Sequence, residues 1–162
     1  MPNIIKEAQT GEIIFGKQGT ILACSALGSC VAVIFYDKIK KIAGLAHVML
    51  PGKSRRKNKT ESFKYSDNAI NELLRKMLSG GCRKKHIRAY LIGGANVLKR
   101  KNETINKLNI KAVINALKVN SIKIAGRSLG GYQRRSVWFD IENNLIKYNI
   151  GSGKRTFLCK TC

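Results

Sequence analysis

Short apolar runs bounded by turn residues recur along most of the chain, and only two segments carry the periodicity of a helix. Strand side chains alternate between two faces, whereas apolar residues three and four positions apart mark one face of a helix. The order of strands, helix, strand, helix and further strands predicts an α+β fold. The runs expected to form strands are residues 12–15, 31–36, 42–50, 86–92, 122–125, 136–140 and 145–150, the last two as a hairpin.

Both predicted helices have one apolar face, which indicates packing against a core. The first begins at Ser66, a residue type that caps helices, and ends before Gly80 and Gly81. The second covers about residues 109–119. The basic and polar segment 52–64, which precedes the first helix, is expected to be an exposed loop. The apolar face of the first helix consists of Ala69, Ile70, Leu73, Leu74, Met77 and Leu78.

Length and composition favour one globular domain. The chain has 162 residues, of which 44% are hydrophobic, enough to build a core. We expect a single domain over residues 1–162, with its core at about 10–150 and a flexible C-terminal tail. No apolar run reaches the roughly 18 residues that cross a membrane, and residues 1–10 lack the apolar stretch of a signal peptide. The sequence therefore predicts a cytoplasmic protein without membrane insertion.

The five cysteines do not predict a disulfide framework, because their number is odd and their spacing irregular. Cys159 and Cys162 form a CxxC pair at the C-terminus, but a zinc site needs about four ligands and no second pair is present. We expect neither a metal nor another cofactor. The pair is interpreted as part of the tail, and its role stays open.

The formal net charge of +22 would attract nucleic acid, an anionic membrane surface or an acidic protein, without deciding among them. Dispersed lysine equally fits a general compositional bias, so a nucleic-acid-binding module is a hypothesis on charge alone. No RNA-binding or zinc-finger motif is present, and Trp138 with scattered tyrosines offers no stacking platform. We therefore expect no specific nucleic-acid partner. The basic clusters are residues 53–57, 83–85, 99–101 and 134–135.

Residues Gly28, Ser29 and Cys30 form a predicted tight turn into a strand, and His47 follows Cys30 on the next predicted strand. If the two strands pair, His47 can take the proton of the Cys30 thiol, and the thiolate can attack a carboxamide or ester carbonyl. The N–H groups of Cys30 and a neighbour would bind the oxyanion. A structural interpretation competes, since single Cys and His residues in apolar strands often only pack or satisfy a core hydrogen bond.

Two segments, residues 27–33 (LGSCVAV) and 44–51 (GLAHVMLP), together resemble the paired signature of the CheD family of chemoreceptor glutamine deamidases. The resemblance covers about residues 10–150, and Asn109 resembles the start of the family's second helix. The supporting segments are residues 64–69 (KYSDNA), 93–95 (GGA) and the double glycine 130–131 followed by 135–137 (RSV).

This resemblance implies a protein that deamidates glutamines of methyl-accepting chemotaxis receptors and that has a CheC-type phosphatase as a partner. It implies Cys30 as the nucleophile and His47 as the base, and we place Ser29 and Gly28 at the oxyanion and the substrate. The fold that it implies is a layered mixed β-sheet with two main helices packed outside, similar to the cytotoxic necrotizing factor deamidases.

The sequence departs from the family at its third catalytic residue, a threonine shortly before the cysteine. No threonine lies between Ile21 and Ser29, and either Cys24 or Ser25 occupies that region. This departure motivates an alternative hypothesis, a non-catalytic adaptor that binds receptors or the phosphatase. The choice of receptor glutamines, a methylesterase side activity and the oligomeric state stay open.

Overall fold

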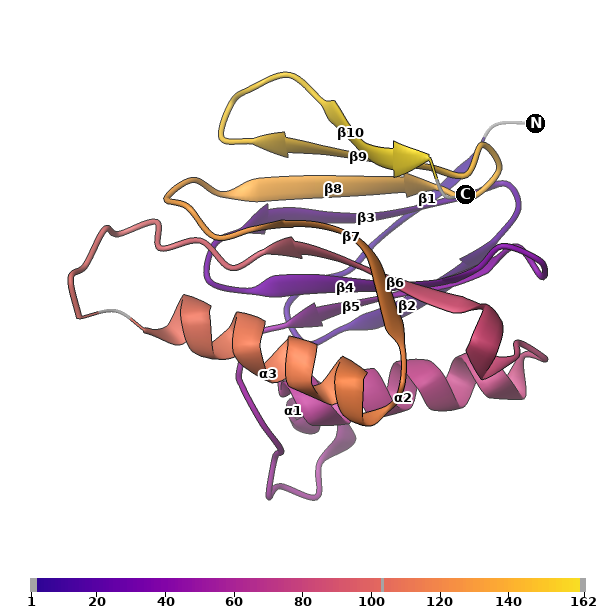
Figure 1. The fold of residues 1–162 in the computed structure, drawn as a ribbon, viewed down its shortest axis with the longest axis horizontal. Helices are drawn as coiled ribbons and strands as arrows, with labels where there is room; N and C mark the ends of the chain where they lie inside the picture. Colours follow the sequence, from indigo (N-terminus) through magenta and orange to yellow (C-terminus); the bar gives the residue numbers. More distant parts are fainter. Residues whose placement is uncertain (1–2, 103, 161–162) are drawn as a thin grey trace.

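Two five-stranded β-sheets stack face to face, and two long helices cover the outer face of one of them (Figure 1). The computed structural model describes residues 3–102 and 104–160. The strands are β1 (Ile4–Glu7), β2 (Ile13–Lys17), β3 (Thr20–Leu27), β4 (Val31–Asp37), β5 (Ile42–Val48), β6 (Ile87–Gly93), β7 (Lys123–Leu129), β8 (Arg135–Asp140), β9 (Leu145–Ile150) and β10 (Thr156–Lys160). The helices are α1 (Lys59–Ser62), α2 (Ser66–Ser79) and α3 (Ile105–Val119), with a 3₁₀ turn at Lys84–His86.

The strand order is β1-β3-β8-β9-β10 in the first sheet and β2-β5-β4-β6-β7 in the second. Each sheet is mixed, because β1 runs parallel to β3 and β6 runs parallel to β7, while the other pairs are antiparallel. The α+β fold with layered mixed sheets and two main helices outside is confirmed, as is the hairpin of β8 and β9. Among the described helices, none has the length and apolar character that spanning a membrane requires.

Strand β4 is buried along its whole length and contributes to both cores. Val33 and Phe35 face α2 and α3, whereas Ile34 and Tyr36 face the first sheet. A strand that is apolar on both faces has a continuous apolar sequence instead of an alternating one. Because β4 lies between β5 and β6, the turn that enters it is flanked by the ends of both neighbours.

The structure corrects the predicted helix starts. Ser66 is the first residue of α2 and not its N-cap, which is Tyr65, and the Ser66 hydroxyl accepts a hydrogen bond from the backbone N–H of Gly52 at 2.9 Å. Helix α3 begins at Ile105, ahead of the predicted start at 109. The apolar periodicity misses this first turn because the buried side chains there are asparagines.

Strands β1, β3 and β10 and the short helix α1 were absent from the sequence prediction. A flexible tail was expected after about residue 150, but Thr156–Lys160 form β10, which pairs antiparallel with β9. Leu158 packs against the core between the sheets, and Lys147 Nζ lies 5.1 Å from the centre of the Phe157 ring. Cys162 lies outside the described residues. Helix α1 forms within the predicted loop 52–64.

Gly44 of β5 lies where α2 crosses the second sheet. A methyl group at this position would meet Phe15 Cε1 at 2.6 Å and Leu73 Cδ2 at 2.7 Å. Distances this short require the Phe15 ring and the Leu73 side chain to shift. The close approach of α2 to β5 therefore depends on a residue without a side chain.

We expect Gly44→Ala to lower the free energy of unfolding by about 1–3 kcal/mol, the usual cost of overpacking a core. Urea unfolding followed by circular dichroism measures this difference. Gly80→Ala is the matched control, because a methyl group there meets no atom closer than 3.4 Å. Equal unfolding midpoints for wild type and Gly44→Ala would contradict the proposed role of this contact.

Candidate active site

The turn that enters β4 is anchored to the residues that follow β6. The carbonyl oxygens of Gly28 and Cys30 accept hydrogen bonds from the backbone N–H groups of Ala95 and Gly94, each at 2.8 Å. In a trans peptide the C=O group and the next N–H group point in opposite directions. The bond to Gly28 therefore directs the N–H of Ser29 away from Ala95.

Asn109 of α3 anchors the middle of the same turn. Its Nδ2 donates hydrogen bonds to the carbonyl oxygens of Ser29 at 3.0 Å and Met49 at 2.9 Å, and the residue is fully buried. Since the Ser29 carbonyl points at Asn109, the N–H of Cys30 points away from α3. Within residues 3–102 and 104–160, no other residue accepts a hydrogen bond from the N–H of Ser29 or Cys30.

Gly93, the last residue of β6, allows this close approach. It has a φ of 121°, and a Cβ atom added to it would lie 2.3 Å from the carbonyl oxygen of Cys30. Any side chain there would displace Cys30 from its position beside the end of β6. The glycine segment 93–94 is thus a geometric requirement of the turn.

The register of β4 and β5 brings Cys30 and His47 to one face of the second sheet. His47 pairs with Ala32, and Cys30 lies two residues before Ala32, so the two side chains are diagonal neighbours. Such neighbours have Cα atoms about 7–8 Å apart. In the described part of the chain, no hydrogen bond joins Cys30 to His47; the imidazole contacts other atoms instead.

Cys24 of β3 contacts the His47 ring from the opposite sheet. Its Sγ lies 3.3 Å from His47 Nδ1, and both groups lie near the carbonyl oxygen of Ala8, at 3.6 Å from Sγ and 3.4 Å from Nδ1. Cys24 is fully buried and His47 is nearly so, whereas Ser25 is exposed. Of the two residues that the sequence left open, Cys24 is the one at the histidine.

One assignment of protons satisfies all three groups at this contact. Burial raises the pKa of Cys24 to about 12, with the nearby Cys30 thiolate as a smaller cause, so its thiol is protonated at neutral pH and can donate to Ala8 O. Burial also lowers the pKa of His47, which keeps its ring neutral near pH 7, although the bond to Ala8 opposes this shift. The Nδ1–H then donates to Cys24 Sγ and Ala8 O, and Nε2 is left as the basic nitrogen.

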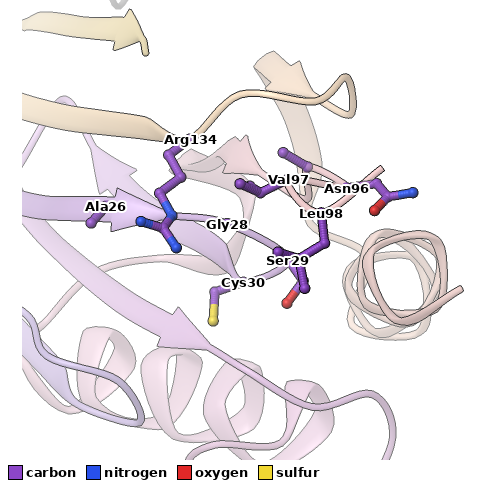
Figure 2. Close-up of a pocket in the computed structure, with 9 residues that line it drawn as sticks. Ala26, Gly28, Ser29, Cys30, Asn96, Val97, Leu98 and Arg134 are labelled. Atoms are coloured by element: carbon purple, nitrogen blue, oxygen red, sulfur yellow. The ribbon is translucent and has the colours of Figure 1, made fainter. Parts of the chain in front are cut away.

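A surface pocket of about 270 Å³ opens beside this turn (Figure 2). Cys30 is half-buried and belongs both to the pocket wall and to the apolar cluster that contains Cys24. His47 and Cys24 do not line the pocket, so of these three side chains only Cys30 is open to a ligand there. The pocket is lined by Ala26, Gly28, Ser29, Cys30, Ala95, Asn96, Val97, Leu98 and Arg134.

The remaining titratable candidates lie elsewhere. His86 ends the 3₁₀ turn before β6, at the opposite end of the sheet from Cys30. In residues 3–102 and 104–160, no three His, Cys, Asp or Glu side chains gather in a way that would hold a metal ion.

Sequence reasoning missed the Ala8 carbonyl, the clamp formed by Asn109 and the position of Arg134. The buried asparagines of α3 do not reveal their partners in the sequence, because the contact of Asn109 joins residues far apart in the chain.

A family model described as CheD chemotactic sensory transduction matches residues 49–149. A "Probable chemoreceptor glutamine deamidase CheD" of Methanococcus maripaludis is 40% identical over 132 residues, which cover 80% of this chain and 85% of that protein. The chain belongs to the CheD family. The range matched by the family model includes the anchoring residues Gly94, Ala95 and Asn109, and it begins just after His47.

Two further relatives extend the comparison. A protein of the same name from Chlorobium luteolum is 32% identical over 157 residues, covering 97% of this chain and 77% of that protein. A solved structure, hypothetical protein YfiH of Bacillus licheniformis, aligns with a TM-score of 0.44 at 13% identity, over 80% of this chain and 59% of that one.

The pKa shifts predict how the two thiols of this CheD-family site react. Burial raises the pKa of Cys30, and its own backbone N–H only partly offsets this effect. We therefore expect alkylation of Cys30 by iodoacetamide to accelerate continuously from pH 7 to pH 9 and beyond, because the thiolate fraction keeps rising. Peptide mass spectrometry at timed intervals measures the rate at each cysteine.

Cys24 is the internal comparison in that experiment. It should stay unlabelled in the folded protein and react once urea unfolds the chain, since it is fully buried. An alkylation rate for Cys30 that already reaches a plateau below pH 7 would contradict the neutral pair and indicate a preformed thiolate–imidazolium pair.

Proposed function

We propose that this chain hydrolyses the side-chain amide of glutamine residues in chemoreceptors, with Cys30 as the nucleophile and His47 as the general base. The observation that carries the proposal is the anchored turn. It presents a half-exposed thiol beside two N–H groups that no other described residue accepts from, on the same sheet face as a histidine whose Nδ1 is already held. The names of the relatives support glutamine deamidation as the reaction class.

Cys30 suits the nucleophile better than Cys24, although Cys24 is the cysteine that contacts His47. Cys24 is fully buried, lies outside the pocket wall and has its pKa raised to about 12 by burial. A substrate entering the pocket meets Cys30 first. We therefore assign Cys24 to orienting the imidazole, the task of the family's threonine.

In the first half of the reaction, His47 Nε2 takes the proton of the Cys30 thiol as the thiolate attacks the carboxamide carbon. A C–S bond forms and the carbonyl π bond becomes an oxyanion. The imidazolium then gives its proton to the amide nitrogen, the C–N bond breaks, and ammonia leaves a thioester on Cys30. Because burial disfavours charge on both groups, the proton moves during the attack and not before it.

In the second half, water attacks the thioester while His47 Nε2 takes one of its protons. The tetrahedral intermediate collapses, the C–S bond breaks, and the proton returns to the Cys30 sulfur. The glutamine has become a glutamate, and the enzyme is restored. The contact of Nδ1 with Cys24 and Ala8 keeps the ring oriented through both proton transfers.

We assign the oxyanion to the N–H groups of Cys30 and Ser29. The carbonyls of the two preceding peptides are held by Asn109 and Ala95, and no other residue in the described ranges accepts a hydrogen bond from either N–H. Such donors act best when they are fixed before the reaction begins. Gly28 has no side chain to block a substrate that approaches these N–H groups.

The adaptor hypothesis rested on the missing threonine. The contact of Cys24 with His47 weighs against it, because the histidine has an orienting partner at that place. The proposal includes a cytoplasmic location and a CheC-type phosphatase as a regulatory partner. The location follows from the sequence pattern and the phosphatase from the resemblance to the family, and both stay predictions.

Ammonia release from a recombinant receptor cytoplasmic fragment tests the proposal. We expect Cys30→Ala to release no ammonia and His47→Ala to lower the rate by about 10²–10⁴-fold, the usual contribution of a general base. Cys82→Ala is the control, since Cys82 is also buried but lies outside the site. Ammonia release by Cys30→Ala at the wild-type rate would refute the nucleophile, and a folded wild type without any release would favour the adaptor.

The orienting role of Cys24 predicts a difference between two substitutions. Cys24→Ala removes the acceptor beside Nδ1 and should lower kcat about tenfold, roughly the effect of one hydrogen bond, with KM unchanged. Cys24→Thr restores an acceptor and should keep or raise kcat. Nitrogen NMR of the His47 ring reports the tautomer in each variant. Equal kcat values and equal ring spectra in wild type and Cys24→Ala would contradict this role.

A further inference from the structure

Arg134 lies at the pocket beside Cys30. The residue is exposed and lines the pocket, and its Nε lies 4.0 Å from the position that a Cβ atom on Gly28 would take. Figure 2 shows its side chain extending from the loop before β8 toward the turn that carries Gly28 and Cys30. A group bound at Cys30 would therefore have a guanidinium beside it.

The guanidinium groups of Arg134 and of its neighbour Arg135 differ in their contacts with the fold. Arg135 is buried, and its side chain donates to Ser128 Oγ at 3.0 Å and to the carbonyl oxygen of Gly130. For Arg134, no side-chain hydrogen bond or ion pair exists with any residue in the described ranges 3–102 and 104–160. Arg135 therefore stabilises the fold through its hydrogen bonds, whereas the side chain of Arg134 is directed to the pocket.

The second loop at the pocket adds positive charge. It continues from Leu98 into the exposed Lys99 and Arg100 and is tied to the Arg134 loop by a hydrogen bond from Asn96 N to Gly131 O at 2.9 Å. Lys99 Nζ also lies 5.9 Å from the centre of the Tyr132 ring. None of the residues that line the pocket is acidic. Arg134 is therefore the cation in the pocket wall, and Lys99 and Arg100 add positive charge just outside it.

We propose that Arg134 makes this site select glutamines that have a carboxylate close by on the same substrate segment. This inference rests on the proposed deamidase function and names the class of substrate that the site prefers. An arginine pairs with a carboxylate through two parallel hydrogen bonds, which adds geometric selection to attraction. Substrate binding would then supply a carboxylate partner for Arg134.

The expected effect is moderate because the pair forms at the rim of a site open to water. A partly exposed arginine–carboxylate pair corresponds to a change of about three- to tenfold in kcat/KM. The change should appear mainly in KM, since the ion pair exists in the bound substrate as well as in the transition state.

The experiment uses the receptor fragment on which ammonia release is measured. Mass spectrometry first maps the glutamines that wild type deamidates. The Glu and Asp residues within about one helical turn of a mapped glutamine, which is four residues, are then replaced by Gln and Asn. We expect this neutralised fragment to lower kcat/KM about three- to tenfold for wild type but to leave kcat/KM unchanged for Arg134→Gln.

Arg83→Gln is the matched control, because it removes the same charge from an exposed position at the other end of the second sheet. It should keep the full sensitivity of wild type to the neutralised fragment. If Arg134→Gln keeps that sensitivity too, or if the mapped glutamines have no acidic neighbours, the inference is wrong while the deamidase function stands. If folded wild type releases no ammonia from any fragment, the proposed function itself fails.

Discussion

The hydrogen bonds that hold the turn before β4 determine what the site can do. Gly28, Ser29 and Cys30 each have their carbonyl oxygen bound, two by backbone N–H groups after β6 and one by the side chain of Asn109. A backbone whose carbonyls are all engaged on one side presents its N–H groups on the other. Electrostatic stabilisation of an oxyanion requires donors fixed in advance, and three separate anchors supply that rigidity.

The same anchors couple the two strands that carry the candidate pair. Asn109 donates at once to Ser29, beside Cys30, and to Met49, two residues after His47. A shift of α3 would therefore move Cys30 and His47 together and preserve their relative position. None of the residues that line the pocket belongs to α2 or α3, but Asn109 of α3 fixes the turn before β4 and the residues after β5.

Much of this arrangement could be predicted from the sequence. The apolar runs of β4 and β5 and the short turn between them indicated that Cys30 and His47 would share a sheet, and the observed register places them on one face. The choice between Cys24 and Ser25 could not be made, because β3 was not predicted and its side chains could not be assigned to a face of the sheet. Nor does any local pattern reveal that a helix asparagine reaches the turn, since that contact joins residues far apart in the chain.

Two thiols beside one imidazole raise the question of which ionises first. A thiolate at Cys30 raises the pKa of Cys24, so the two sulfurs oppose each other's charge and behave as a coupled pair. Full burial places the greater penalty on Cys24, while the backbone N–H of Cys30 favours the thiolate there. Cys30 is therefore the thiol that ionises more readily, and burial holds Cys24 protonated as a donor to Ala8 O. A cysteine in the place of the family's threonine can orient His47 without becoming a reactive thiolate, because burial keeps its thiol protonated.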